Sequence, residues 1–283
     1  MRALADLAGR QYNSAPFAIG REKVRDYLAA TGGAASRHPG AVPLCFAAVY
    51  AMSPALALLR DPAIAPVFPR VLHTEQRFLT TRSVRSGDEV TATGAVRRVA
   101  ERFGASFLFF ETAVDDATGA RVAEAASTFV IRPEGDTVAL PAPEARAELA
   151  AGTRLTRASP AGAVGTAISR RASRRDLAAY ADAGGDRNPI HWDPDHARAQ
   201  GLPGVIVHGL LLMAWAGQAV TEAVAGEGAL IELAAKFKGV VLADEEVRFQ
   251  ATVSQPGAGR AQFGVTGRGS RGPAVTATAT VAW

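Results

Sequence analysis

The feature that most constrains the fold of this 283-residue chain is that its two halves carry the same elements in the same order. Residues 24–33 and 173–185 each predict a short helix that ends at paired glycines, which suit a C-terminal helix cap. A longer apolar stretch follows in each half, at about residues 42–59 and 208–224. Because neither stretch has a strongly polar face, each predicts a long helix that is buried on nearly all sides.

Strand-like segments then follow in matching order in both halves. They are residues 77–78, 87–90, 105–114 and 121–131 in the first half, and 236–237, 244–247, 261–266 and 274–283 in the second. The last pair is rich in Val and Thr, with the small and polar alternation that is typical of antiparallel strands. This order predicts an α+β fold in which a curved antiparallel sheet wraps a long buried helix, twice in tandem. The alternative is that the likeness reflects only the Ala- and Arg-rich composition of both halves.

The division between the repeats is predicted at a segment of different composition. Residues 1–135 form the first repeat in this interpretation, residues 164–283 the second, and residues 136–163 a linker. The linker is rich in Pro, Ala, Glu and Arg and lacks a strong apolar period, so it is expected to cross the surface. A short helix at about residues 143–150 is the one element expected within it.

Composition and charge limit the partners of the chain. Hydrophobic residues make up 48% of it and charged residues 20%, which is typical of a globular protein with an ample core. The net charge is +4, but the basic residues are spread along the chain and form no stripe with interleaved aromatic residues, so no nucleic-acid partner is expected. A mild positive charge suits an anionic small substrate equally well.

The single cysteine and the N-terminal sequence indicate the compartment. Cys45 is alone, so no intrachain disulfide is possible, and its apolar surroundings predict a buried, inert thiol. Residues 1–20 have no apolar signal-peptide core, and no stretch reaches the ~18 apolar residues of a membrane span. We therefore expect a cytoplasmic protein that does not bind membranes.

A short loop in the second half carries a carboxylate and an imidazole. Asp186 follows two glycines, which allow a sharp turn, and His191 follows five residues later. Pro189 stiffens the loop and biases Asn188 toward an extended backbone. The spacing suits a general acid/base pair that holds one water molecule between its side chains. The alternative is a structural Asx-turn, in which Asp186 and Asn188 cap the loop and His191 packs beneath it.

A nearby group of polar residues offers a second interpretation of the same region. His191, Asp193, Asp195 and His196 have the residue types of a metal site. However, Asp193 and Pro194 predict an N-cap followed by the first turn of a helix that runs through Ala199 and stops at Gly201. A helix start would splay these side chains apart, so no metal site is expected.

Gly209 is expected at the start of the long apolar helix of the second half. The first N–H groups of a helix have no internal partner, and a glycine lets a ligand oxygen approach them closely. A thioester carbonyl placed there would be polarised as enolate charge develops. The alternative is that Gly209 only permits close packing of the helix on the sheet. His208 is expected to be a packed, hydrogen-bonded imidazole rather than a second base.

Together these residues resemble the MaoC-like dehydratases, the (R)-specific or type-2 enoyl-CoA hydratases, in their two-repeat form. The resemblance covers about residues 168–283. The matching residues are Tyr180, Gly185, Asp186, Asn188, Pro189, Ile190, His191, Gly201, Pro203, Ile206, His208 and Gly209. The fold that it implies is the double hot-dog, which agrees with the order of elements described above.

The resemblance also implies a reaction and the roles of four residues. Asp186 and His191 would hold and activate the catalytic water, Asn188 would support them, and the Gly209 N–H would form the oxyanion hole. The implied reaction is the reversible hydration of a trans-2-enoyl thioester to a (3R)-3-hydroxyacyl thioester, without a metal or redox cofactor. The chain departs from the family pattern at Gly184, where a Ser or Thr is usual.

The first half resembles the degenerate repeat of two-repeat family members. Residues 34–38 follow its paired glycines and contain no aspartate, so His38 lacks an acidic partner and no second catalytic site is expected. This half would line the pocket for the acyl chain. Residues 72–76 recur in such repeats, and we interpret them as a strand and interface feature.

Several functions and partners stay open. The substrate is expected to be an acyl-CoA or an acyl carrier protein (ACP) thioester, whose phosphates could meet Lys236, Lys238 or Arg248. Alternatives to an enoyl-CoA hydratase are a 3-hydroxyacyl-ACP dehydratase, a hot-dog thioesterase and a non-catalytic acyl-thioester binding protein. A thioesterase would need an acid on its helix, and the second apolar helix starts without one. Two repeats in one chain are compatible with a monomer or a homodimer.

Overall fold

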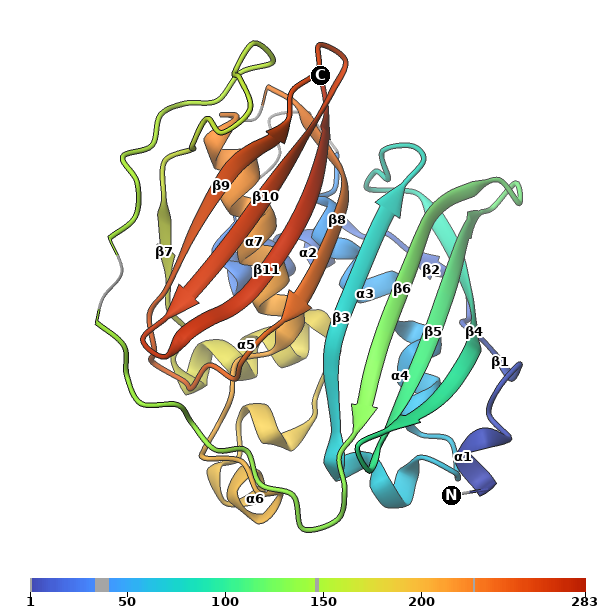
Figure 1. The fold of residues 1–283 in the computed structure, drawn as a ribbon. Helices are drawn as coiled ribbons and strands as arrows, with labels where there is room; N and C mark the ends of the chain where they lie inside the picture. Colours follow the sequence, from blue (N-terminus) through green and yellow to red (C-terminus); the bar gives the residue numbers. More distant parts are fainter. Residues whose placement is uncertain (1, 34–40, 146–147, 226) are drawn as a thin grey trace.

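One antiparallel sheet of eleven strands runs through both halves of the chain (Figure 1). The computed structural model describes residues 2–33, 41–145, 148–225 and 227–283. The strands are β1 (Gln11–Asn13), β2 (Phe17–Ala18), β3 (Val71–Thr80), β4 (Glu89–Arg102), β5 (Ala105–Asp116), β6 (Arg121–Ile131), β7 (Ile168–Arg170), β8 (Ala229–Phe237), β9 (Val247–Gln255), β10 (Arg260–Gly269) and β11 (Gly272–Ala282). The order across the sheet is β7-β9-β10-β11-β8-β3-β6-β5-β4-β1, with β2 beside β4.

The strand order has the same pattern on both sides of the pair β3 and β8. Outward from β3 the order is β6, β5 and β4, and outward from β8 it is β11, β10 and β9. Each half therefore arranges its strands in the same way, which confirms the predicted tandem repeat. The seam itself pairs Glu75 with Lys236 at one end and Leu79 with Glu232 at the other. Residues 72–76 therefore lie in a strand at the interface of the repeats, as predicted.

The second half contains the long buried helix that its sequence predicts. Helix α7 (Gly209–Ala223) lies against strands β8, β9, β10 and β11 (Figure 1). Eleven of its fifteen residues are buried, because its polar residues are confined to Gln218, Thr221 and Glu222 near its end.

The corresponding helix of the first half is broken, which corrects the prediction of one long helix over residues 42–59. The segment forms η1 (Leu44–Phe46), α3 (Ala47–Tyr50) and α4 (Ser53–Leu59), and most of it is buried. Pro54 stands in the first turn of α4. A proline has no N–H to donate to the preceding turn and therefore interrupts a helix. Apolarity predicted the burial of this segment, and the proline explains its division.

Two short helices precede these elements and end as predicted. Helix α2 (Arg21–Thr31) is closed by Gly32 and α5 (Arg174–Gly184) by Gly185, both in the left-handed conformation. Helix α5 begins with a capping box, in which the side chains of Ser173 and Asp176 each bond to the backbone of the other residue. The remaining helices are α1 (Arg2–Ala5), η2 (Ala65–Arg70), η3 (Pro189–His191) and α6 (Pro194–Ala199).

The predicted starts of two strands lie in turns instead. Gly87 and Asp244 have φ angles of 101° and 66°, which are left-handed, and the strands that follow begin at Glu89 and Val247. A left-handed residue cannot continue an extended strand, so the charged residues predicted as strand starts belong to the preceding turns.

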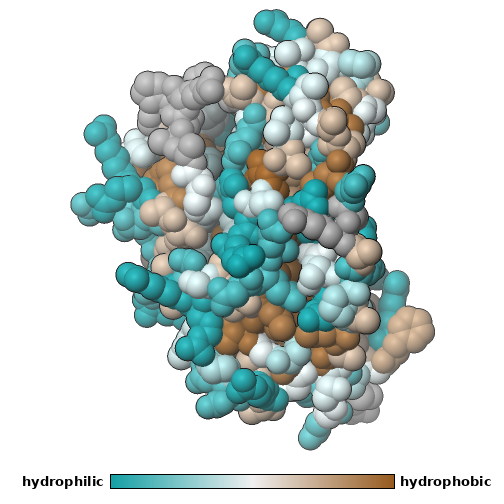
Figure 2. Space-filling view, turned by 90° about the vertical axis from the view of Figure 1, so that its left-hand side faces the viewer, coloured by the Kyte–Doolittle hydropathy of each residue, from teal (hydrophilic) through white to brown (hydrophobic). Residues whose placement is uncertain are grey.

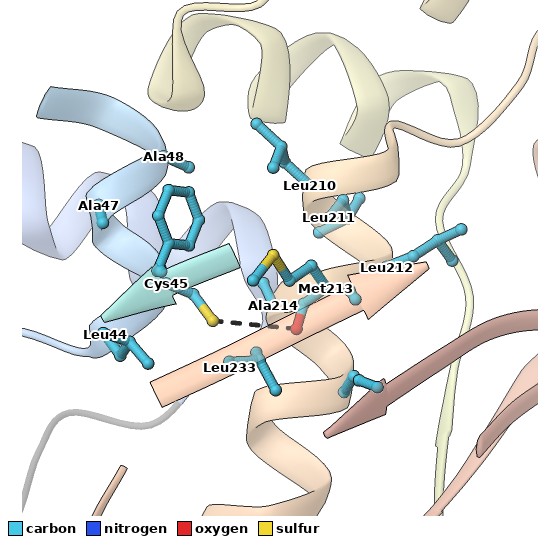
Figure 3. Packing of buried hydrophobic residues seen from close by; sticks show 14 of the residues in the cluster. Leu44, Cys45, Ala47, Ala48, Leu210, Leu211, Leu212, Met213, Ala214 and Leu233 are labelled. Atoms are coloured by element: carbon cyan, nitrogen blue, oxygen red, sulfur yellow. Dashed lines mark hydrogen bonds between the residues drawn. The ribbon is translucent and has the colours of Figure 1, made fainter. Parts of the chain in front are cut away.

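One core joins the two repeats. Figure 3 shows η1 and α3 facing α7, with the Cys45 thiol 3.8 Å from the Met213 carbonyl oxygen. Cys45 is buried as predicted, and burial raises the pKa of its thiol to about 12, which keeps it protonated.

The linker crosses the outside of the molecule without regular structure. Residues 143–145 and 148–150 are not helical, so the short helix predicted there is wrong for the described part of the segment. Its backbone groups are bound at long range instead: the Glu144 N–H donates to Ser270 O, and Ala150 O accepts from the Gln250 side chain.

Figure 2 shows the face of the molecule on this side, where hydrophilic side chains predominate and hydrophobic residues gather in patches. Within the described ranges, no helix combines the length and apolarity that spanning a membrane requires.

Candidate active site

The loop after α5 turns sharply and places Asp186 beside His191. Gly185 has a φ angle of 86°, which a residue with a side chain adopts only at a cost. Asp186 Oδ1 accepts a hydrogen bond of 3.2 Å from the Asn188 N–H, and Asn188 Oδ1 accepts one of 3.4 Å from the Ile190 N–H. The Asx-turn interpretation is therefore correct for the backbone of the loop. It leaves Asp186 Oδ2 and the ring of His191 available for chemistry.

His191 presents an unprotonated nitrogen to Asp186. Its Nδ1 lies 2.8 Å from Ile206 O, and because a carbonyl oxygen only accepts hydrogen bonds, Nδ1 carries the proton of the neutral ring. Its Nε2 lies 3.8 Å from Asp186 Oδ2. This distance is too long for a direct hydrogen bond, and it suits a water molecule that bonds to both groups.

Burial and local hydrogen bonds set the charges of this pair. Burial opposes the charge of Asp186, but the imidazoles of His191 and His208 and the Asn188 N–H outweigh it, so the pKa of Asp186 lies below its ordinary value. Burial also lowers the pKa of His191, and the charge of Asp186 only partly offsets this. The site therefore combines an ionised carboxylate with a neutral imidazole at neutral pH.

His208 packs directly behind His191, as expected for a structural imidazole. The two rings are stacked with their centroids 3.7 Å apart, and His208 Nε2 lies 3.1 Å from Asp186 O. Tyr180 contacts the other side of His208 edge-on, at 4.8 Å between centroids. Burial lowers the pKa of His208 to about 3, so this ring is neutral. It supports both the ring of His191 and the backbone of Asp186.

The arrangement of these side chains does not fit a metal ion. Asp186, His191 and His208 each offer a ligand atom within 4.8 Å of the others. However, the lone pairs of stacked rings run side by side instead of converging, and His208 Nε2 is committed to the Asp186 carbonyl. Asp193 caps α6, because its Oδ1 accepts from the N–H groups two and three residues later. The predicted cap is thus confirmed, and it takes Asp193 out of any shared ligand set.

Gly209 stands at the start of α7 on the same cavity, and both of its predicted roles have support. A Cβ at this position would lie 2.9 Å from the ring of Phe237, so only glycine allows the observed packing. Its N–H has no hydrogen-bond partner in the described part of the chain, as is usual for the first residue of a helix. The close packing and the available N–H therefore coexist at one residue.

A cavity of about 520 Å³ connects these groups with both halves of the chain. Its lining includes Asp186, Asn188, His191 and Gly209, so the four predicted site residues lie together. Its apolar lining comes from both halves: the first half supplies Met52, Leu56, Leu59, Phe68, Val71, Leu72 and Phe129, and the second supplies Ile190, Ile206, Val207, Leu210, Leu212, Phe237, Val240 and Val241. Toward the second half it is lined by Lys238, Gly239, Glu245, Ser270, Arg271 and Gly272, and the linker adds Val138, Ala139 and Pro141.

The basic residues predicted near the substrate differ in their surroundings. Lys238 lines the cavity and is exposed. Lys236 forms an ion pair of 3.1 Å with Glu75 across the seam. Arg248 lies in β9 and is not part of the cavity wall. Lys238 is therefore the one of the three that lines the cavity.

Gly184 also lines the cavity, next to Tyr180. A Cβ at Gly184 would lie 3.2 Å from Tyr180 Cζ, which is a tight contact. The glycine at this position thus lets the aromatic ring pack directly against the turn of helix that precedes Asp186.

Sequence reasoning missed one residue of the cavity wall, His73. Burial lowers the pKa of His73 to about 4, although the nearby charge of Asp186 opposes this. Residues 72–76 were predicted as an interface strand only, because an extended strand gives no reason for a histidine to face the other repeat's loop. The signal in the sequence was a single histidine after the apolar residues Val71 and Leu72 of a strand. His38, for which no acidic partner is expected, lies outside the described residues.

Two known protein families each match one part of the chain. The MaoC like domain matches residues 156–270, and the FAS1-like dehydratase domain region matches residues 6–125. A UPF0336 protein of Clavibacter michiganensis subsp. michiganensis is 37% identical over 131 residues, which are 42% of this chain and 88% of that protein.

Solved structures with the same fold cover nearly the whole chain. A MaoC-like dehydratase aligns with a TM-score of 0.82 and 24% identity, over 99% of both chains. HtdX from Mycobacterium tuberculosis aligns with a TM-score of 0.69 and 22% identity, over 96% of this chain and 100% of that one. A conserved protein of the same organism, described as having a double hotdog fold, aligns with a TM-score of 0.68 and 12% identity, over 97% and 96% of the two chains.

Proposed function

Because the chain belongs to the MaoC-like dehydratase family and has the double hot-dog fold, we propose that it is a hydro-lyase that reversibly hydrates trans-2-enoyl-CoA to (3R)-3-hydroxyacyl-CoA. The observation that carries this proposal is the separation of 3.8 Å between Asp186 Oδ2 and His191 Nε2. These two atoms border the cavity that also contains the Gly209 N–H. A water held between them and a thioester oxygen at Gly209 are the two positions that hydration of an enoyl thioester requires.

In the proposed mechanism, each group has a distinct task. Asp186 orients the water, and His191 Nε2 takes one of its protons as the oxygen adds to C3 of the enoyl group. Negative charge develops on the thioester oxygen and is stabilised by the Gly209 N–H at the positive end of α7. His191 then returns the proton to C2, which completes the addition of water. Asn188 acts indirectly, because its side chain fixes the turn that carries both reactive groups.

We assign different tasks to the two repeats. Residues 164–283 supply the chemistry, residues 1–135 hold the acyl chain, and residues 136–163 link them. The apolar wall formed by Met52, Leu56 and Phe68 supports this assignment, since it lies in the first repeat but opens on the reactive centre of the second.

The competing functions differ in the groups that they need. The first turn of α7 contains no acidic residue, which disfavours a hot-dog thioesterase with an acid on that helix. A non-catalytic binding protein has no need of an ionised carboxylate beside a neutral imidazole. A 3-hydroxyacyl-ACP dehydratase would use the same groups to catalyse the reverse reaction. It would differ from the proposed hydratase in direction and in the carrier of the acyl group.

One set of assays separates these functions. We expect the purified protein to remove the 2-enoyl absorbance of crotonyl-CoA, or of a longer analogue, without release of free CoA thiol. Thiol release without hydration would indicate a thioesterase. Binding of the acyl-CoA with neither reaction would indicate a binding protein. Hydration of the ACP thioester only would identify the carrier as ACP.

A further inference from the structure

His73 is directed into the cavity by an irregularity of its own strand. The pairing of β3 with β6 shifts between His73 and Glu75, which marks a β-bulge at this point. A bulge re-aims the neighbouring side chain and often lies next to an active site. The ring of His73 is fixed there, because its Nε2 lies 3.0 Å from Glu75 O and must therefore donate its proton to that oxygen.

Two phenylalanines enclose the imidazole, one from each repeat. Phe129 stands opposite His73 on β6, and the ring centroids are 4.7 Å apart. Phe237 is the last residue of β8 and meets His73 edge-on, at 5.4 Å between centroids. The pairing of β3 with β8 ends with Glu75 and Lys236, so His73 and Phe237 lie just beyond the end of the seam.

Phe237 in turn contacts the start of α7. Three atoms of its ring lie 2.9 to 3.1 Å from the position that a Cβ of Gly209 would take. The contacts from His73 to Phe237 and from Phe237 to Gly209 thus connect the first repeat with the N–H that the proposed mechanism uses. All three residues line the cavity that contains Asp186.

We propose that His73 is a positioning residue of the first repeat, which holds Phe237 against Gly209 and so fixes where the thioester oxygen meets the Gly209 N–H. This inference rests on the proposed hydratase function. The imidazole transfers no proton in this role, because its Nε2–H is bound to Glu75 O and the ring is neutral well below pH 6. The repeat without the acid/base pair thereby contributes to the rate of the reaction as well as to binding of the acyl chain.

A double-mutant cycle with His73→Ala and Phe237→Ala tests the inference. We expect His73→Ala to lower kcat by ~10–100-fold, because a small displacement of a reacting group has effects of this size, with KM changed less than about threefold. In the Phe237→Ala background the same change should lower kcat by less than about twofold. His73→Phe should keep kcat within about threefold of the wild type, because it retains the ring. His196→Ala, which removes a histidine outside the cavity wall, is the matched control.

Three results of the activity assays would overturn the inference. The first is a wild-type kcat in the folded His73→Ala protein. The second is an equal loss of kcat on His73→Ala in the wild-type and the Phe237→Ala backgrounds. The third is a change in the shape of the pH-rate profile that marks His73 as a proton donor. A crystal structure of the His73→Ala protein gives a readout besides activity, and an unmoved Phe237 would also overturn the inference. If the wild-type protein hydrates no enoyl thioester, the proposed function fails, and this crystal structure still decides whether His73 positions Phe237.

Discussion

At the scale of single residues, the site depends on histidines that burial keeps neutral. His73, His191 and His208 each bond to a backbone carbonyl oxygen through one ring nitrogen. Each carbonyl fixes the tautomer of its ring, because a carbonyl oxygen can only accept a hydrogen bond and the ring nitrogen beside it must carry the proton. Of the three, only His191 faces the carboxylate of Asp186 with an unprotonated nitrogen at 3.8 Å. In the proposed mechanism, the same residue type therefore serves catalysis once and packing twice.

The pH dependence of the reaction follows from these protonation states. The proposed mechanism needs an ionised Asp186 and a neutral His191, and the pKa of each lies below its ordinary value. As the pH falls, His191 gains its proton only below the ordinary histidine value of about 6.5. We expect kcat/KM for crotonyl-CoA to be level from pH 8 to about 6.5 and to fall only below that. An acid limb centred above about 6.5 in a pH-rate profile would contradict the assignment.

The stability of the fold should also depend on buried histidines. Burial lowers the pKa of His73 to about 4, whereas the unfolded chain titrates near 6.5. Between these values the unfolded state binds a proton that the folded state does not, so the free energy of unfolding falls as the pH is lowered. Each such histidine contributes a slope of up to about 1.4 kcal/mol per pH unit.

Urea unfolding at several pH values between 5 and 6.5 measures this slope. We expect a smaller slope for His73→Phe than for the wild type, because one of the titrating groups is gone. Equal slopes for the two proteins would show that His73 titrates in the folded state as it does in the unfolded chain.

Sequence reasoning named four residues that lie together in one cavity, but it did not find the whole of the cavity wall. Asp186, Asn188, His191 and Gly209 could be predicted because their spacing on one loop and at one helix start is local. His73 could not, because its direction depends on a bulge in the pairing of β3 with β6, which involves residues more than fifty positions apart. Local patterns specify local geometry, and long-range pairing decides which repeat completes the site.

At the scale of elements, α5 sets the position of the reactive loop. The helix starts at the capping box of Ser173 and Asp176 and ends at Gly184, two residues before Asp186. Ser173→Ala removes one half of the box and should lower the free energy of unfolding by about 1 kcal/mol. We expect kcat to stay close to the wild-type value, because the C-terminal end of the helix is untouched.

Urea unfolding and hydration assays of the same preparations measure both effects. Ser169→Ala, which changes an exposed serine on β7, is the matched control and should leave the stability within about 0.5 kcal/mol of the wild type. If Ser173→Ala were as stable as this control, the capping box would not stabilise α5.

The two long apolar segments show what an element's composition does and does not predict. Both are buried, as their lack of a polar face indicates. Only the second is continuous, because the first contains Pro54 and the second contains no proline. The predicted single helix over residues 42–59 is wrong, because a proline interrupts the apolar run.

At the scale of the whole molecule, the two repeats form one sheet and one core. Strands β3 and β8 join them through backbone hydrogen bonds, and Arg77 crosses the seam to Glu232 at 2.7 Å. The order of elements predicted two repeats of one unit, but periodicity alone gives no reason for these two strands to pair. The cavity lies between the repeats, so neither contains the whole of it.

This arrangement predicts that the covalent linker is not needed once the protein has folded. A specific protease site inserted after Arg157, in an exposed turn, would allow the folded chain to be cut there. We expect the two fragments to stay together on gel filtration and to retain hydratase activity, because the shared core and the seam hold them. Separation of the fragments without denaturant would show that the seam is weaker than the structure implies.

The most direct test of the account compares two aspartates that lie four residues apart. Asp186 faces His191 in the cavity, whereas Asp182 is 70% exposed and pairs with Arg187. With crotonyl-CoA as the substrate, Asp186→Asn should lower the initial rate of loss of the 2-enoyl absorbance by ~10²–10⁴-fold. Asp182→Asn should keep the wild-type rate, and both proteins should remain folded. Hydration by Asp186→Asn at the wild-type rate would contradict the central claim that Asp186 and His191 carry the reaction.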